Sequence, residues 1–185
     1  MLFRSDPVDG TTNFLYGLPG YAVSIAASLT GDHRAAVGAD YLPATDELFS
    51  AIEGRGARLD GRPIGCTATN QLSQALVATG FAYRSDRRAT QATRVAALLP
   101  RIRDIRRLGA AAPDLCYVAA GRLDASFEEH LGPWDLAAGE LIARESGCLT
   151  GSLDGGPAHP SSVIVAAPGV FEPLRTAIAE IDQTH

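Results

Sequence analysis

The sequence predicts a single α/β (α+β) domain built in layers, and three observations support this prediction. Up to residues 70–75 the pattern is that of short strands joined by tight turns. From residue 75 onward, short apolar runs alternate with longer segments of helical periodicity. The chain has 185 residues, 46% of them hydrophobic and 20% charged, which suffices for one sizeable core. We therefore expect one domain over residues 1–185, with a boundary between two sub-layers near residues 70–75.

The first sub-layer is expected to be a meander of antiparallel strands. Residues 21–30 predict a strand, because Val23, Ile25, Ala27 and Leu29 share one face. Gly31-Asp32 predicts a turn into strands over 35–42 and 47–53. Asp60-Gly61 then predicts a hairpin turn.

The second sub-layer is expected to alternate strands with helices. The apolar runs predict strands over 75–79, 105–108, 123–128 and 162–166. Helical periodicity predicts helices over 89–102, 135–146 and 170–181. A further helix is expected before residue 121, since Pro113 suits its first turn and Gly121 the position after its end.

Composition excludes several classes of function. The net charge of −5 disfavours nucleic acid or an anionic membrane as the main partner. No apolar run approaches the ~18 residues of a membrane span and no signal peptide is recognisable, so we expect a cytoplasmic protein. All 16 basic residues are arginine, which excludes a Schiff-base or P-loop lysine. Phosphate would have to be bound by arginine, backbone N–H groups or metal.

Cysteine, histidine and arginine patterns carry little functional signal by themselves. The cysteines are far apart without a CxxC spacing, which favours reduced core residues over a redox or zinc role: Cys66, Cys116 and Cys148. The histidines show no ligand spacing and are interpreted as surface residues: His33, His130, His159 and His185. An arginine cluster is interrupted by Asp104, which favours a solvated helix end or subunit contact over a phosphate patch: Arg101, Arg103, Arg106 and Arg107.

The first segment that indicates chemistry is Asp6-Pro7-Val8-Asp9-Gly10-Thr11-Thr12-Asn13-Phe14. Two carboxylates separated by a stiff proline can converge on a hard cation such as Mg²⁺, with the Val8 carbonyl as a further ligand. Gly10 allows a close turn, and Thr11-Thr12 can open a short helix whose N–H groups point at an anion. Taken alone, the segment is more typical of a plain turn with an aspartate cap.

The second segment runs from Pro133 through Trp134-Asp135 to Gly147. Asp135 lies where a helix begins, and the small residues 137–139 would let that helix pack closely against another backbone. Alone, it is also typical of a helix-capping aspartate beside a core tryptophan. Glu145 is interpreted as structural.

Together, DPVDGTTNF and PWDLAAGELIARESG resemble the two signature motifs of the inositol monophosphatase family, the Mg-dependent, lithium-sensitive sugar phosphatases. The segments 80–83, 106–112 and 119–128 are similar to this family too, so the resemblance covers residues 6–181. It implies the layered sugar-phosphatase fold shared with fructose-1,6-bisphosphatase. It also implies Mg²⁺ as cofactor and a homodimer.

The resemblance implies specific roles for matching positions. Asp6, Asp9 and Asp135 correspond to the family's Mg²⁺-binding aspartates, with the Val8 carbonyl as a backbone ligand. Those aspartates would serve metal-assisted hydrolysis, in which one Mg²⁺ activates a water and a second stabilises the leaving oxygen. No covalent intermediate is implied.

The remaining matches concern the substrate. Gly10 and Thr11 correspond to positions whose amides bind the phosphate, and the Thr11 hydroxyl to one that orients the attacking water. Ala111 corresponds to a backbone contact with the substrate ring, and Glu128 to a ligand of a sugar hydroxyl. Without the resemblance, Glu128 would be interpreted as a surface charge at a strand end.

The sequence also departs from the family. The family's N-terminal segment of roughly 80 residues, which carries two long helices and a glutamate loop for metal and water, has no counterpart before Asp6. Without the glutamate we expect weak activity or none, because a general acid–base group contributes ~10²–10⁴-fold in rate.

The substrate expected from Glu128 and the Gly109–Ala112 loop is inositol 1-phosphate or a related polyol or sugar monophosphate. Phosphatases of the same fold acting on histidinol phosphate, fructose 1,6-bisphosphate or nucleotide 3′-phosphates are alternatives. A non-catalytic metal- or phosphate-binding protein is the alternative from a different class.

Overall fold

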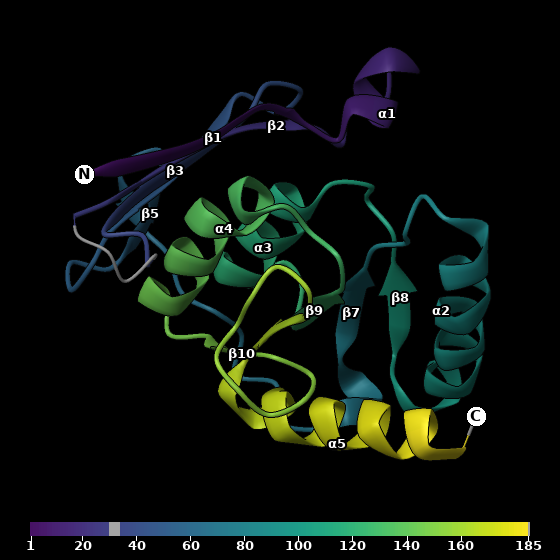
Figure 1. The fold of residues 1–185 in the computed structure, drawn as a ribbon. Coiled ribbons are helices and arrows are strands. Elements are labelled where there is room, and N and C mark those ends of the chain that lie inside the picture. Colours follow the sequence, from purple (N-terminus) through teal and green to yellow (C-terminus); the bar gives the residue numbers. More distant parts are fainter. Residues whose placement is uncertain (30–33, 185) are drawn as a thin grey trace.

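The computed structural model describes residues 1–29 and 34–184, which form four layers of alternating sheet and helices (Figure 1). The first sheet is antiparallel and follows chain order: β1 Leu2–Asp9, β2 Ala22–Ser28, β3 Val37–Leu42, β4 Glu47–Ile52, β5 Ala57–Leu59 and β6 Arg62–Pro63. The second has the order β10-β11-β9-β7-β8: β7 Leu76–Thr79, β8 Asp104–Arg106, β9 Ala125–Glu128, β10 Leu149–Gly151 and β11 Val163–Ala166. β7 pairs in parallel with both β8 and β9, so these three strands end at the same edge.

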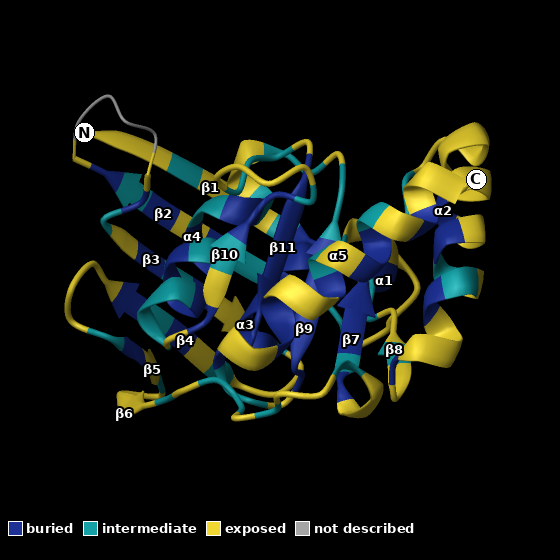
Figure 2. Cartoon of the chain, turned by 90° about the horizontal axis from the view of Figure 1, so that it is seen from below, coloured by how far each residue is buried: buried dark blue, intermediate teal, exposed yellow. Residues whose placement is uncertain are grey.

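The helices separate and cover the two sheets. They are α1 Thr11–Leu15, α2 Ser85–Leu98, α3 Ala111–Ala119, α4 Pro133–Glu145 and α5 Pro168–Thr184, with 3-10 turns at Leu72–Gln74 and Leu99–Arg101. α3 and α4 lie between the sheets, whereas α2 and α5 pack on the far face of the second sheet (Figure 1). β7, β9 and β11 are almost entirely buried as a result (Figure 2). Among the described residues no helix is long and apolar enough to cross a membrane.

Two glycines allow α4 to approach its neighbours closely. A Cβ on Gly38 of β3 would lie 3.0 Å from the Ala138 Cα, and one on Gly139 would lie 2.7 Å from the Leu115 Cδ1. The predicted close packing of the small residues in α4 is therefore confirmed. Glu145, predicted to be structural, accepts hydrogen bonds from the Gly54 and Gly56 amides at 3.0 and 2.9 Å.

The other face of the first sheet is apolar and exposed. Its large side chains are 45% to 66% exposed at five positions: Phe3, Ile25, Val37, Leu48 and Ile52. No helix of the described chain packs on this face, because α3 and α4 occupy the opposite one.

Most predicted elements are present, with shifted ends. The Asp60-Gly61 turn joins β5 to β6, and Thr11-Thr12 opens α1. The helix expected from residue 89 begins at Ser85, and the helix expected from residue 135 begins at Pro133. The Gly31-Asp32 turn, His33 and His185 lie outside the described residues.

Several expectations differ from the structure. β1 was not predicted, because Pro7 and the two aspartates are unfavourable in strands. β10 was not predicted either, because it has only three residues. The arginine cluster is not one helix end, since Arg106 lies in β8 and Arg107 follows it. Trp134 is 50% exposed and not a core residue. The cysteines are free as expected, with Cys116 and Cys148 buried.

Candidate metal and phosphate site

A β-bulge at the end of β1 brings two aspartates to the same side of the strand. Side chains three residues apart face opposite sides of a regular strand. Here Asp6 pairs with Ser24 and Asp9 with Ala22, so β1 contains one extra residue between these pairs. That extra residue reverses the alternation of side chains along β1, so both carboxylates face α3 and α4.

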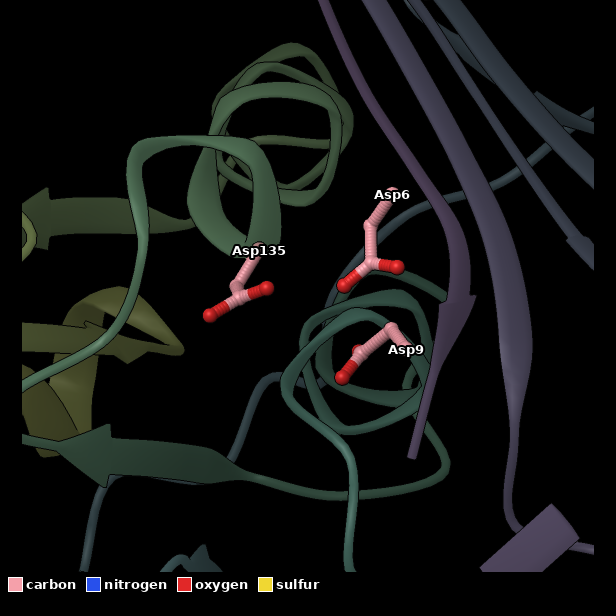
Figure 3. A group of neighbouring side chains, drawn as sticks. All are labelled: Asp6, Asp9 and Asp135. Atoms are coloured by element: carbon pink, nitrogen blue, oxygen red, sulfur yellow. The ribbon is translucent and has the colours of Figure 1, made fainter. Parts of the chain in front are cut away.

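Asp135 completes a cluster of three carboxylates (Figure 3). It lies in the first turn of α4, and one oxygen from each of Asp6, Asp9 and Asp135 lies within 4.8 Å of the others. In the described part of the chain, none of the three forms an ion pair with arginine or histidine. The predicted convergence of these side chains is therefore present in the structure.

Backbone amides orient each carboxylate. Asp6 Oδ1 accepts a hydrogen bond from the Val8 amide at 2.9 Å, and Asp135 Oδ2 accepts one from the Gly132 amide at 2.7 Å. Asp9 Oδ2 accepts one from the Ala112 amide, also at 2.7 Å. The amides fix one oxygen of each group, which restricts the directions in which the others point.

Electrostatics at this cluster favour a bound cation. Burial and, to a lesser extent, the neighbouring charges of Asp135 and Asp6 together raise the pKa of Asp9 to about 7, although the hydrogen bond from the Ala112 amide lowers it. Burial also raises the pKa of Asp135 to about 6. Carboxylate oxygens are the ligands that Mg²⁺ prefers, and a divalent cation would relieve their mutual repulsion. The donor set therefore fits Mg²⁺.

The turn after the first two aspartates requires glycine. Gly10 has φ of 85°, and a Cβ there would lie 2.7 Å from the Gly20 carbonyl oxygen and 2.9 Å from the Ala110 Cβ. Thr11 begins α1, and its hydroxyl donates a 3.0 Å hydrogen bond to the Val8 carbonyl. Gly10 and Thr11 thus lie directly beside the carboxylate cluster, as predicted.

Asn13 connects this turn to the rest of the site. Its amide nitrogen donates to the carbonyls of Gly20 and Leu108 at 2.6 and 2.7 Å. Sequence reasoning missed this role, although an asparagine within a turn motif was an available signal. The bridge positions the loop before α3, which carries Ala111.

Most of the residues predicted to bind substrate line a cavity of about 290 Å³. Asp9, Gly10, Ala111, Glu128 and Asp135 all line it. Sequence reasoning missed further lining residues, among them Gly80, Arg84, Arg87, Arg107 and His130. His130, an exposed residue as expected, has φ of 65° at the rim of this cavity.

Glu128, at the end of β9, packs into space left by a glycine. A Cβ on Gly80 would lie 1.8 Å from the Glu128 Oε1, so a side chain at this position would displace the Glu128 carboxylate. Burial raises the pKa of Glu128 to about 7, although the Arg107 charge opposes the shift. Glu128 is thus a cavity residue and not the plain surface charge that its sequence context alone suggests.

The four layers and the acidic cluster beside a glycine turn define the class of the protein: a layered sugar-phosphatase fold with a site for metal. The family model described as "Inositol monophosphatase family" matches residues 5–183. The chain belongs to the inositol monophosphatase family, whose members depend on metal.

Relatives and solved structures agree with this assignment. Inositol-1-monophosphatase of Mycobacterium leprae is 45% identical over 179 residues, covering 94% of this chain and 61% of that protein. A protein named Nus factor SuhB in Escherichia coli K12 is 45% identical over 82% of this chain and 56% of its own length. The structure of Mycobacterium tuberculosis SuhB has a TM-score of 0.88 at 43% identity, covering 99% of this chain and 73% of that one. Inositol monophosphatase from Anabaena has a TM-score of 0.90 at 35% identity, covering 97% and 71%.

Proposed function

We propose that the protein is a Mg²⁺-dependent phosphatase acting on inositol 1-phosphate or a related polyol or sugar monophosphate. The observation that carries this proposal is the convergence of Asp6, Asp9 and Asp135 within 4.8 Å. They adjoin the cavity that Gly10 and Glu128 line. Because the chain spans 61% of the Mycobacterium leprae relative, the activity of that whole protein supports the proposal by analogy.

The three aspartates, with the Val8 carbonyl, are the proposed Mg²⁺ ligands. Bound there, Mg²⁺ would lower the pKa of a coordinated water and neutralise charge on the phosphoryl group. The Thr11 hydroxyl already contacts the Val8 carbonyl, which places it beside the proposed ligands. We assign Thr11 to orienting the attacking water.

The chain's backbone and Glu128 would position the substrate. The Gly10 and Thr11 amides are proposed to donate hydrogen bonds to the phosphate, since unpaired N–H groups at such turns attract anions. Ala111 begins α3 at the cavity wall and would contact the polyol ring through its backbone. Glu128 would accept a hydrogen bond from a ring hydroxyl, which favours a cyclic polyol over an acyclic one.

The deciding measurement is phosphate release from inositol 1-phosphate, with and without Mg²⁺, by the chain and by Asp9→Asn. Asp60→Asn is the matched control, because Asp60 lies in the exposed turn between β5 and β6. Release that requires Mg²⁺ and disappears only in Asp9→Asn supports the proposal. Mg²⁺ and phosphate binding without turnover would instead favour a non-catalytic binding protein.

Glu128→Gln tests the choice of substrate. We expect it to reduce selectivity for inositol 1-phosphate over glycerol 3-phosphate, because the amide is a weaker acceptor for the ring hydroxyl. Unchanged selectivity would favour histidinol phosphate or another substrate of the same fold. The homodimer and the cytoplasmic location stay predictions from the resemblance and the composition.

A further inference from the structure

The cavity beside the carboxylate cluster has a second, cationic wall. Arg84, Arg87 and Arg107 line it together with the acids Asp9 and Asp135. The proposed function uses the acidic side chains and the backbone groups of this cavity and leaves these arginines without a role. They are concentrated at one cavity in a chain whose net charge is −5.

The topology explains why these arginines face the same space. β7, β8 and β9 run in parallel, so the segments that follow them lie along one edge of the sheet. Arg107 follows β8, and Glu128 ends β9. The segment after β7 leads through Arg84 into α2, whose first turn contains Arg87 (Figure 1). Ligands commonly bind at the carboxyl edge of such parallel strands.

Two of these guanidinium groups are available to a ligand. Arg84 pairs with Asp86 at 2.6 Å, and the Glu129 carboxylate at the cavity is paired with Arg94 at 2.6 Å. Within the described ranges, by contrast, Arg87 and Arg107 form no ion pair and no side-chain hydrogen bond. Arg107 experiences the charges of Glu128 and Asp114 without contacting either.

We propose that Arg87 and Arg107 form a second anion subsite at the rim of this cavity, so that the preferred substrate is a phosphorylated polyol with a second anionic group. This inference rests on the proposed function, because the first phosphate is assigned to Gly10, Thr11 and the metal. Guanidinium groups bind phosphate or carboxylate through paired N–H donors, which suits either anion. Glu128 lies in the same cavity and would contact the hydroxyls between the two ends.

The test compares ligands that differ in one anionic group. Isothermal titration in Mg²⁺ would use non-hydrolysable phosphonate analogues of inositol 1-phosphate and inositol 1,4-bisphosphate. A third analogue carries a carboxylate at the far end and distinguishes carboxylate from phosphate recognition. The proteins are the full chain, Arg87→Gln, Arg107→Gln and the control Arg103→Gln. Arg103 is exposed and directly precedes β8, so the control makes the same charge change at the opposite end of that strand.

We expect the bis-phosphonate, or the carboxylate analogue, to bind at least tenfold more tightly than the mono-phosphonate. Arg87→Gln and Arg107→Gln should each remove most of that gain and leave mono-phosphonate binding within about twofold, whereas Arg103→Gln retains it. Equal binding of all three analogues would overturn the subsite while leaving the proposed function in place. If Arg103→Gln lost the affinity gain to the same extent, the gain would come from overall charge. That result would also overturn the proposed subsite. Failure of every analogue to bind in Mg²⁺ would contradict the proposed function itself, and the subsite with it.

Discussion

The Asp9 carboxylate accepts a 2.7 Å hydrogen bond from the Ala112 amide, 103 residues further along the chain. This bond joins the end of β1 to the first turn of α3, and therefore connects the carboxylate cluster to the wall of the neighbouring cavity. Ala111, the neighbour of the donor, lines that cavity. Occupation of the proposed metal site and the position of α3 would thus be physically connected.

Asp9→Asn should weaken Mg²⁺ binding by at least tenfold, because it removes one of three anionic ligands. The amide still accepts the Ala112 hydrogen bond, so the fold should remain intact. Calorimetric titration with Mg²⁺ measures the affinity, and circular dichroism checks the fold. Asp60→Asn is the matched control, and equal affinities of the two variants would refute the ligand assignment.

Asn13→Ala should lower the free energy of unfolding by about 1–3 kcal/mol, because it leaves the Gly20 and Leu108 carbonyls without their donor. Thr12→Ala, one residue earlier at an exposed position, should change it by less than about 0.5 kcal/mol. Urea unfolding followed by circular dichroism measures both. Similar losses in the two variants would show that the Asn13 bridge adds no stability.

Asp40 should make stability depend on pH. It is fully buried in β3, accepts a 3.3 Å hydrogen bond from the Cys116 thiol, and burial raises its pKa to about 6 from 3.8. The folded state binds this proton more tightly than the unfolded state does. Protonated Asp40 therefore contributes stability that is fully present below pH 3.8 and is lost as pH rises through 6.

Asp40→Asn should therefore be more stable than the parent at pH 8, by on the order of 2 kcal/mol. The difference should shrink toward pH 4, where the parent carboxyl is neutral. Urea unfolding of both proteins in chelator, at pH 4, 6 and 8, gives this comparison. A difference that stays constant with pH would argue against titration of Asp40.

Arg94→Met should destabilise the protein by about 1–3 kcal/mol, because water still reaches the two acids that lose their hydrogen bonds. Arg94 is buried in α2 and binds Glu129 at 2.6 Å and Asp182 of α5 at 2.8 and 2.9 Å, so its loss leaves two acids unpaired. Arg101→Met removes an exposed pair with Glu180 and should cost less than about 1 kcal/mol. Thermal or urea unfolding compares the variants, and equal small losses would contradict a structural role for Arg94.

Gly139→Val should destabilise the protein by roughly 1–3 kcal/mol through overpacking, because even a Cβ would lie 2.7 Å from the Leu115 Cδ1. Ala137→Val introduces the same side chain two residues earlier in α4, at a half-buried position beside a separate cavity. Ala137→Val should lower the free energy of unfolding by much less than Gly139→Val does. Equal unfolding midpoints would mean that α3 and α4 can separate freely at Gly139.

Local sequence patterns predicted much of this protein. Alternation over 21–30, the Asp60-Gly61 turn and the helical period after Asp135 are properties of neighbouring residues, so β2, the β5–β6 hairpin and α4 were recognisable. The types and spacing of Asp6 and Asp9 likewise indicated a cation site, and the resemblance to the family added Asp135. Their chemistry depends on carboxylate groups, which are visible in the sequence itself.

Tertiary structure determined which other residues these side chains contact. The bulge that places Asp6 and Asp9 on one side exists only through pairing with β2, and Asp9 meets Ala112 only after α3 packs beside it. Gly80 and Glu128 come together because β7 and β9 pair in parallel. Each of these contacts joins positions far apart in the chain, and no local pattern encodes them. The sequence by itself therefore determined most of the secondary structure and the carboxylate chemistry of the candidate site, whereas packing between distant segments determined the shape and charge of the cavity.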